Sequence, residues 1–202
     1  GWDVSNVTNM AGMFIGANAF NQDISTANGW DVSNVTSMAS MFSFNSTFNQ
    51  DISDWDVSNV TDMQRMFNSS NFNQDISGWV VSNVTTMESM FENNDKFNQD
   101  ISIWDISSVT NLESMFEGAS AFDQNLGDWT MLNVTSINRM FYLSGLSTAN
   151  YDAALNGWST QVLQQGVYFI SSGSVYSSAG EAARQYIIDT YVWTFSGDSL
   201  EP

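Results

Sequence analysis

Apolar and polar residues alternate in a short motif that returns along most of the chain. In W-D-V-S, Trp55 and Val57 share one parity while Asp56 and Ser58 share the other, which predicts a short strand with one dry and one wet face. Turning the apolar face outward would bury a column of aspartates, and an unpaired buried carboxylate costs several kcal/mol. We therefore expect the tryptophans to point inward.

The hydrophobic period changes directly after this motif. Val60, Met63, Met66 and Phe67 fall on one helical stripe. This spacing predicts a short helix or a pair of 3₁₀ turns on the opposite side of each coil. The later segment F-N-Q-D-I is expected to be the return stretch, with Phe and Ile facing inward and the polar residues in a turn.

The N-V-T corner joins these two patterns. Thr61 is followed three residues later by Gln64, which is the spacing of a capping box, and the pairs Thr85 with Glu88 and Thr110 with Glu113 share it. The asparagines of this corner are expected to bond turn backbone as a ladder from coil to coil: Asn6, Asn34, Asn59, Asn83 and Asn133. N-V-T is also an N-glycosylation sequon. Its recurrence in register with the apolar positions favours the structural role.

The motif has a fixed period. Its tryptophans recur about every 25 residues, at Trp2, Trp30, Trp55, Trp79, Trp104 and Trp129, and the first interval carries an insertion at 26–28. Such a period indicates a solenoid, because no single coil can bury its apolar face alone. The predicted fold class is an α/β solenoid with a parallel β-sheet, an inward tryptophan ladder, and helical or 3₁₀ turns opposite.

The repeat dissolves towards the C-terminus. Apolar spacing predicts a helix over 148–165, a strand at 167–170, a second helix over 179–190 opened by Ser178 and Glu181, and a strand at 192–195. We divide the chain into a repeat region of about six coils at 1–147 and a capping region of the same domain at 148–202, which would seal one end of the solenoid. Because Gly1 already lies inside a repeat, we expect the chain to be part of a larger, multidomain protein.

Composition narrows the function classes. The net charge of -18 disfavours nucleic acid and anionic membranes as partners, and no apolar run predicts membrane insertion. With neither Cys nor His, the chain has no thiol nucleophile, no thiolate metal site and no imidazole base. Paired carboxylates would be the remaining catalytic chemistry, and no such pair stands out. We expect a protein that is not an enzyme.

The unit WDVSNVTxMxxMF…FNQDIS resembles the bacterial BspA-like leucine-rich-repeat surface proteins, in the branch whose repeats carry Trp, Met and Phe. The resemblance covers residues 1–141, and the segment after it is similar to the cap that often follows these repeats. It implies an exported or surface-displayed protein concerned with adhesion to host cells, matrix proteins or other microbes. It carries over no binding residues, because the matched positions belong to the framework.

The candidate binding face consists of the residues that flank the inward tryptophans. They are Asp31, Asp54, Asp56, Val80, Ile103, Asp105, Asp128 and Thr130. Val80, Ile103 and Thr130 replace expected polar or acidic residues, which favours a specific site over a rigid spacer. The alternative is a solvated face whose aspartates discourage sheet aggregation.

A second acidic column recurs in the F-N-Q-D turns, at Asp23, Asp51, Asp75 and Asp100. We interpret these aspartates as turn caps, with a weak Ca²⁺ site between coils as the alternative; no other cofactor is expected. The functional hypothesis is an extracellular adhesin module that binds a protein or peptide on a host or neighbouring cell. The alternatives are a glycan-binding adhesin domain and a purely structural spacer.

Overall fold

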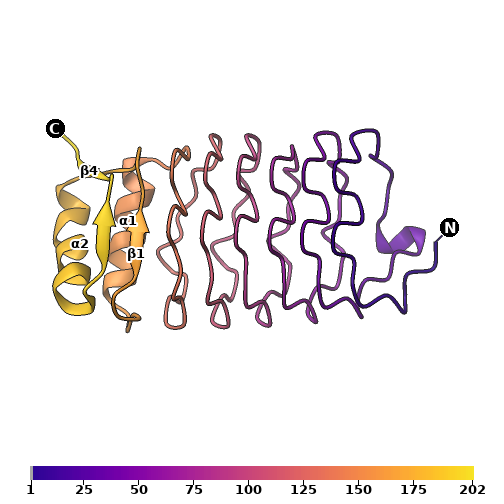
Figure 1. The fold of residues 1–202 in the computed structure, drawn as a ribbon, viewed down its shortest axis with the longest axis horizontal. Helices are drawn as coiled ribbons and strands as arrows, with labels where there is room; N and C mark the ends of the chain where they lie inside the picture. The colour runs from indigo at the N-terminus through magenta and orange to yellow at the C-terminus, as the bar shows by residue number, and fades with distance from the viewer. Residues whose placement is uncertain (1) are drawn as a thin grey trace.

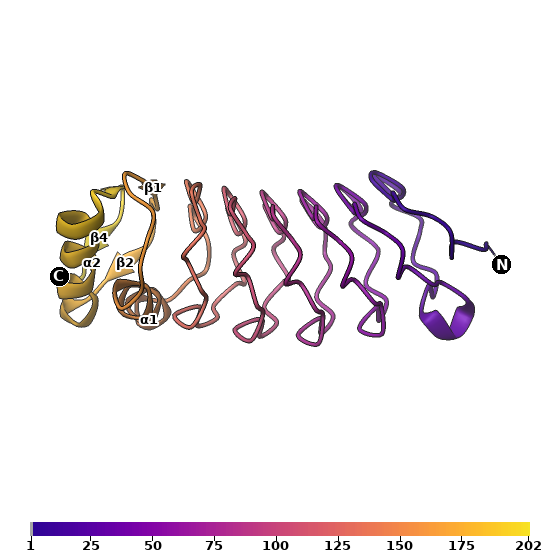
Figure 2. The same ribbon diagram turned by 90° about the horizontal axis from the view of Figure 1, so that it is seen from below.

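Successive coils of the chain stack along the long axis of an elongated molecule (Figure 1). This computed structural model describes residues 2–202, so the expectation that rests on Gly1 lies outside the described residues. Figure 2 shows helix α2 (Ser178–Tyr191) closing the C-terminal end and the helical turn η1 (Thr26–Asn28) projecting from the coil nearest the N-terminus. One hydrophobic core runs through the stack from Val4 to Trp193.

Regular secondary structure lies mainly in the C-terminal part. The helices are η1 (Thr26–Asn28), α1 (Thr148–Ser159) and α2 (Ser178–Tyr191), and the strands are β1 (Tyr168–Ile170), β2 (Val175–Tyr176), β3 (Thr194–Ser196) and β4 (Ser199–Leu200). Strand β1 pairs in parallel with β3, and β2 pairs in parallel with β4. Neither α1 nor α2 has the length and hydropathy needed to cross a membrane, and neither does any other helix within residues 2–202.

The strand predicted at W-D-V-S is wrong. Throughout residues 2–202 this motif is an extended segment that ends in a turn, as where Val60 N donates to Val57 O at 2.9 Å. Backbone pairing between coils occurs instead just after N-V-T, through a column of isolated parallel bridges that links Asn9, Ser37, Asp62, Thr86, Asn111 and Ser136. Alternation therefore predicted which side chains are buried but not where the chains pair.

From Trp30 onwards the tryptophans of the repeat point inward, as predicted from the cost of burying aspartate, whereas Trp2 in the first coil is 62% exposed. The ladder residues Trp30, Trp55, Trp79, Trp104 and Trp129 are 0–7% exposed. Each indole from Trp55 onwards donates to a backbone carbonyl of the preceding coil, as Trp79 Nε1 does to Ile52 O at 3.1 Å. The W-D-V-S segments, where strand pairing was expected, are therefore linked from coil to coil by indole N–H groups.

The helix or 3₁₀ turns predicted after N-V-T are also wrong. Met66 N donates to Met63 O at 3.2 Å, but Arg65 between them has a φ of 56°, which neither an α-helix nor a 3₁₀-helix adopts. The segment is a run of tight turns. Alternate N–H groups point to the next coil instead, as Arg65 N does to Glu88 O at 2.8 Å. A spacing of three residues fits such turns as well as it fits a helix.

The predicted capping boxes are absent from these coils because there is no helix to cap. Thr85 instead donates to Thr61 O of the preceding coil, from its backbone N at 2.9 Å and from Oγ1 at 3.0 Å. The asparagine ladder is confirmed from Asn34 onwards, since Asn83 Nδ2, for example, donates to Ser58 O at 2.7 Å, whereas Asn6 Nδ2 donates to the neighbouring Ser5 Oγ instead. The Asn and Thr of N-V-T thus link one coil to the next, while the Val between them, such as Val84, lies in the core.

In the C-terminal region the predicted elements are present with shifted bounds. Helix α1 ends at Ser159 and leaves Val162 exposed, and its N-cap Ser147 accepts a bond from Asn150 N. Helix α2 is capped by Ser177, one residue before the predicted cap. Strands β2 and β4 were not predicted, since two-residue strands leave almost no pattern in a sequence.

Candidate functional site

The residues on either side of the buried tryptophans form a surface that we call the tryptophan side. The structure exposes all eight candidate residues there: Asp31, Asp54, Asp56, Val80, Ile103, Asp105, Asp128 and Thr130. They belong to the irregular segments around W-D and not to a β-sheet. The candidate face exists as a surface, but its backbone is not that of a sheet.

Several of its aspartates already have a structural partner. Asp31, Asp56 and Asp105 each accept a bond at 3.0 Å from the backbone N of the serine two residues later. The hydroxyl and the N–H of that serine lower the pKa of each of these carboxyl groups below its ordinary value. These side chains fix the turn that follows W-D-V, and they remain negatively charged on the surface.

Asp54 has a different role. Its Oδ2 accepts a bond from Thr26 N at 2.9 Å and another from the Thr26 hydroxyl. The insertion at 26–28 is the 3₁₀ turn η1, and Asp54 holds its first residue. Asp54 is therefore a structural anchor between two coils.

Val80 and Ile103 are the exposed apolar residues of this surface. Their exposed fractions are 57% and 75%, and both line one open depression of about 310 Å³ together with Trp79 and Asp105. Ile103 also borders a smaller depression of about 190 Å³, lined by Asp75 and Asp100 among others. The structure brings Val80, Ile103 and Asp105 together, whereas Asp31, Asp128 and Thr130 lie outside both depressions.

The aspartates of the F-N-Q-D turns act as turn caps, as interpreted from the sequence. Asp23, Asp51, Asp75 and Asp100 each accept a bond from the backbone N of the serine two residues later. Within residues 2–202, no group of three or more acidic side chains is arranged to hold a metal ion. The carboxylates of both columns are spaced along the stack, one per coil.

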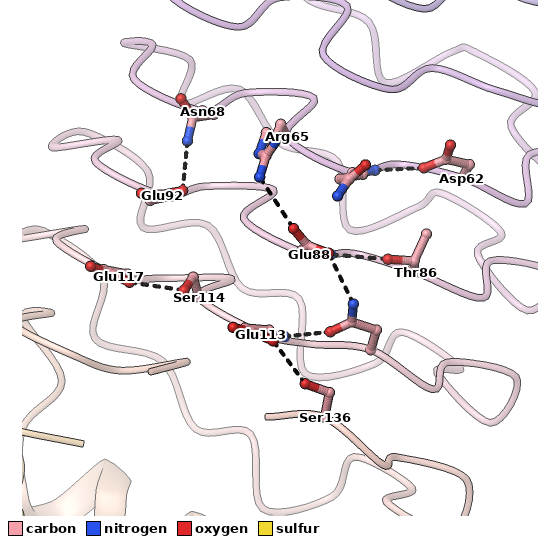
Figure 3. Close-up of polar contacts among 12 residues, drawn as sticks. Asp62, Arg65, Asn68, Thr86, Glu88, Glu92, Glu113, Ser114, Glu117 and Ser136 are labelled. Carbon is pink, nitrogen blue, oxygen red and sulfur yellow. Dashed lines mark hydrogen bonds and ion pairs between the residues drawn. The ribbon is translucent and has the colours of Figure 1, made fainter. Parts of the chain in front are cut away.

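A second polar surface, which we call the turn side, lies on the tight turns and was missed by the sequence analysis. Figure 3 shows four glutamates there on two neighbouring coils, Glu88, Glu92, Glu113 and Glu117. Arg65 pairs with Glu88 at 3.3 Å, and Arg139 pairs with Glu117, with Nε donating to Oε2 at 2.8 Å. The sequence offered a signal for this surface, because these glutamates stand among small polar residues. Glu88 and Glu113, however, were interpreted as members of capping boxes.

The turn side also carries a depression of about 360 Å³ lined by Phe44, Arg65, Asn68, Ser69, Glu92 and Asn93. It shares no lining residue with the depressions of the tryptophan side. The sequence signal for this depression was the aromatic residue at position 44, because the other coils carry mostly Gly, Ser or Asn there.

The chain is similar in sequence to one described family. The model of a family described as "Mycoplasma protein of unknown function, DUF285" matches residues 1–84 and again residues 68–179. Neither the search of curated proteins nor the search of solved structures found a match.

Proposed function

We propose, from the premise that this chain belongs to the DUF285 family, that it is a solenoid of the leucine-rich-repeat type related to the BspA-like surface proteins. In this proposal it is a non-enzymatic binding module of a bacterial adhesin outside the cell. Its partner is a protein or peptide on a host or neighbouring cell surface, and the contact is made by the tryptophan side.

The observation that carries the proposal is the exposed apolar pair Val80 and Ile103. At the positions of Val80, the other coils carry aspartate or threonine; at those of Ile103, they carry glycine or aspartate. Both departures fall on one depression of about 310 Å³. A framework has no need of exposed apolar residues, whereas adjacent exposed apolar side chains are typical of contact surfaces.

The surrounding charge defines the partner. Asp75, Asp100 and Asp105 border the depressions that Ile103 lines, and no lysine or arginine lines them. A peptide with an apolar side chain between basic residues fits this arrangement, since Val80 and Ile103 would receive the apolar group while the carboxylates attract lysine or arginine. The net charge of -18 would also speed the approach of a basic partner at low salt.

The test is a screen of the folded domain against a library of short peptides, with and without Ca²⁺. The variants V80D and I103D introduce residues that other coils already carry at these positions, so the fold should be retained. We expect enrichment of basic peptides with an apolar residue, and loss of binding in either variant. V162D, at an exposed valine elsewhere, is the matched control and should bind as the unaltered domain does.

Two results would redirect the proposal. Binding on a glycan array that V80D and I103D abolish would favour the glycan alternative at the same surface. Failure of the folded domain to bind any peptide or glycan would favour the spacer.

A further inference from the structure

Phe44 adopts a costly backbone conformation at an exposed position. Its φ is 56° and its side chain is 57% exposed. The same position of the stack holds Gly16, Ser69, Asn93, Gly118 and Leu143 in the other coils, all with positive φ. A bulky residue in this region is an outlier that costs free energy, and such outliers gather at functional sites.

The side chains of this column lean over the following coil. Asn93 lies over Gly118, and Leu143 lies against Gly173. Phe44 borders one depression with Ser69, the next residue of the column, and with Asn93 beyond it. Because Ser69 is small, an open space of about 360 Å³ remains beside the Phe44 ring. Leu143, in contrast, lies outside that depression.

Arg65, on the same depression, has hydrogen-bond donors to spare. The equivalent residue, Arg139, makes two bonds to Glu117 and lies 4.2 Å from the centroid of the Tyr142 ring. Arg65 makes one longer bond to Glu88 at 3.3 Å, and Asn68 stands where the tyrosine stands beside Arg139. The guanidinium of Arg65 thus lacks two contacts that Arg139 makes, namely a second hydrogen bond to a carboxylate and an adjacent aromatic ring.

The polar lining is balanced between donors and acceptors. Arg65 supplies donors, Glu92 supplies acceptors, and the amides of Asn68 and Asn93 contain both. Asn68 Nδ2 donates to Glu92 Oε2 at 2.9 Å, as Figure 3 shows, which orients that carboxylate. One arginine and one glutamate leave the lining without net charge, so neither a strongly cationic nor a strongly anionic ligand is favoured.

We propose that this depression is a binding site for a neutral saccharide, separate from the tryptophan side. The apolar face of a sugar ring would lie on the exposed Phe44 ring. Its hydroxyl groups would donate to Glu92 and accept from Arg65 and the asparagine amides, because each hydroxyl can do both. Shape, aromatic surface and mixed hydrogen bonding thus converge on one ligand class.

The test uses saturation-transfer NMR on the whole domain with lactose, maltotriose, cellotriose and triacetylchitotriose, followed by an array of neutral hexose and N-acetylhexosamine oligosaccharides. We expect binding of at least one saccharide. F44N should weaken that binding by about tenfold or more, on the scale of a lost central aromatic contact. R65Q should weaken it less, and F44N should leave the melting temperature unchanged or higher, because asparagine tolerates this φ.

L143N is the matched control, since it changes a bulky residue in the same column outside the depression. It should bind as the unaltered domain does, and so should V80D from the tryptophan side. The inference is overturned if no neutral saccharide binds, if only charged glycans or peptides bind, or if F44N and L143N bind equally well. The peptide screen at the tryptophan side can fail without affecting any of these outcomes.

Discussion

Trp158 Nε1 donates to the backbone carbonyl of Leu126 at 3.0 Å. Trp158 lies on helix α1, yet its indole makes the same bond that Trp129 makes to Ile101 one coil earlier, also at 3.0 Å. The tryptophan ladder therefore continues from the tight turns into the capping region. Trp158 is not recognisable from the sequence as a ladder residue, because it lies in the segment where the repeat has dissolved.

Removing one tryptophan of the ladder should be severe. Trp79→Ala leaves a cavity at a residue that is almost fully buried, and we expect a loss of roughly 3–5 kcal/mol in the free energy of unfolding. Trp79→Phe retains much of the packing but leaves Ile52 O without its donor, for which about 1–3 kcal/mol is expected. Urea unfolding of both variants gives the two values. A Trp79→Phe variant as stable as the unaltered domain would show that the indole bond contributes nothing beyond volume.

The aspartate after the tryptophan should matter through both its acceptor oxygen and its charge. Asp56→Asn keeps an oxygen that can accept from Ser58 N but loses the charge that these bonds favour, as the lowered pKa of Asp56 indicates, whereas Asp56→Ala removes both. Thermal unfolding should therefore show a small decrease in melting temperature for the asparagine variant and a larger decrease for the alanine variant. A melting temperature raised by both changes would show that repulsion between the stacked aspartates outweighs these bonds.

An ion pair in the cap should be critical for the C-terminal end. Arg184 donates to both carboxylate oxygens of Asp198 at 2.7 and 2.8 Å, and the Asp198 side chain is 1% exposed and also accepts from Tyr151. Asp198→Ala leaves a partly buried guanidinium and a buried phenol without their acceptor, so a loss of about 3 kcal/mol is expected. Hydrogen exchange should locate the loss in α2 and β4. Uniform loss of protection across the repeats would contradict this.

Acid should destabilise the coils within a narrow range of pH. Serine hydroxyl and backbone N–H groups lower the pKa of Asp51, Asp75, Asp100 and the aspartates after tryptophan. Carboxyl groups of the unfolded chain therefore take up protons first as the pH falls. The stability they contribute is complete above about pH 4 and is lost as the pH falls through the lowered folded pKa values.

Urea midpoints at several pH values test this expectation. They should stay level from about pH 7 to pH 5 and decline below about pH 4. Ser58→Ala should raise the pKa of Asp56, which NMR titration measures directly. A decline that begins near pH 6 would indicate other groups.

Phe44→Asn should stabilise the protein. Phenylalanine with a φ of 56° pays the steric cost of the left-handed region, about 1 kcal/mol, which asparagine largely avoids. Its side chain is mostly exposed, so little apolar contact is lost. Urea unfolding measures the gain, and Phe42→Asn, in the buried stack, should instead destabilise strongly. A stability loss on Phe44→Asn would mean that the ring packs more than its exposure indicates.

Burial was predictable from the sequence, whereas hydrogen bonding between coils was not. The parity of Trp55 and Val57 and the spacing of Met63 and Met66 correctly gave the inward side chains. The same spacing suggested a helix because Arg65, which has a positive φ, is neither glycine nor asparagine, the residues that would mark such a turn in a sequence. The tryptophan side was predictable as an exposed surface. The depression at Phe44 was not, because it depends on which residues of three successive coils meet.

Bonds between coils run along the stack from one coil to the next, as Thr85 N to Thr61 O and Arg65 N to Glu88 O illustrate. A force that pulls the two ends apart along this axis stretches these bonds directly, so coils separate one after another and not all together. Each released coil of about 25 residues extends the chain by roughly 80 Å, since an extended residue spans about 3.4 Å and a stacked coil occupies about 4.8 Å. Under tension the molecule would therefore lengthen in steps while the coils that remain stacked keep their surfaces intact.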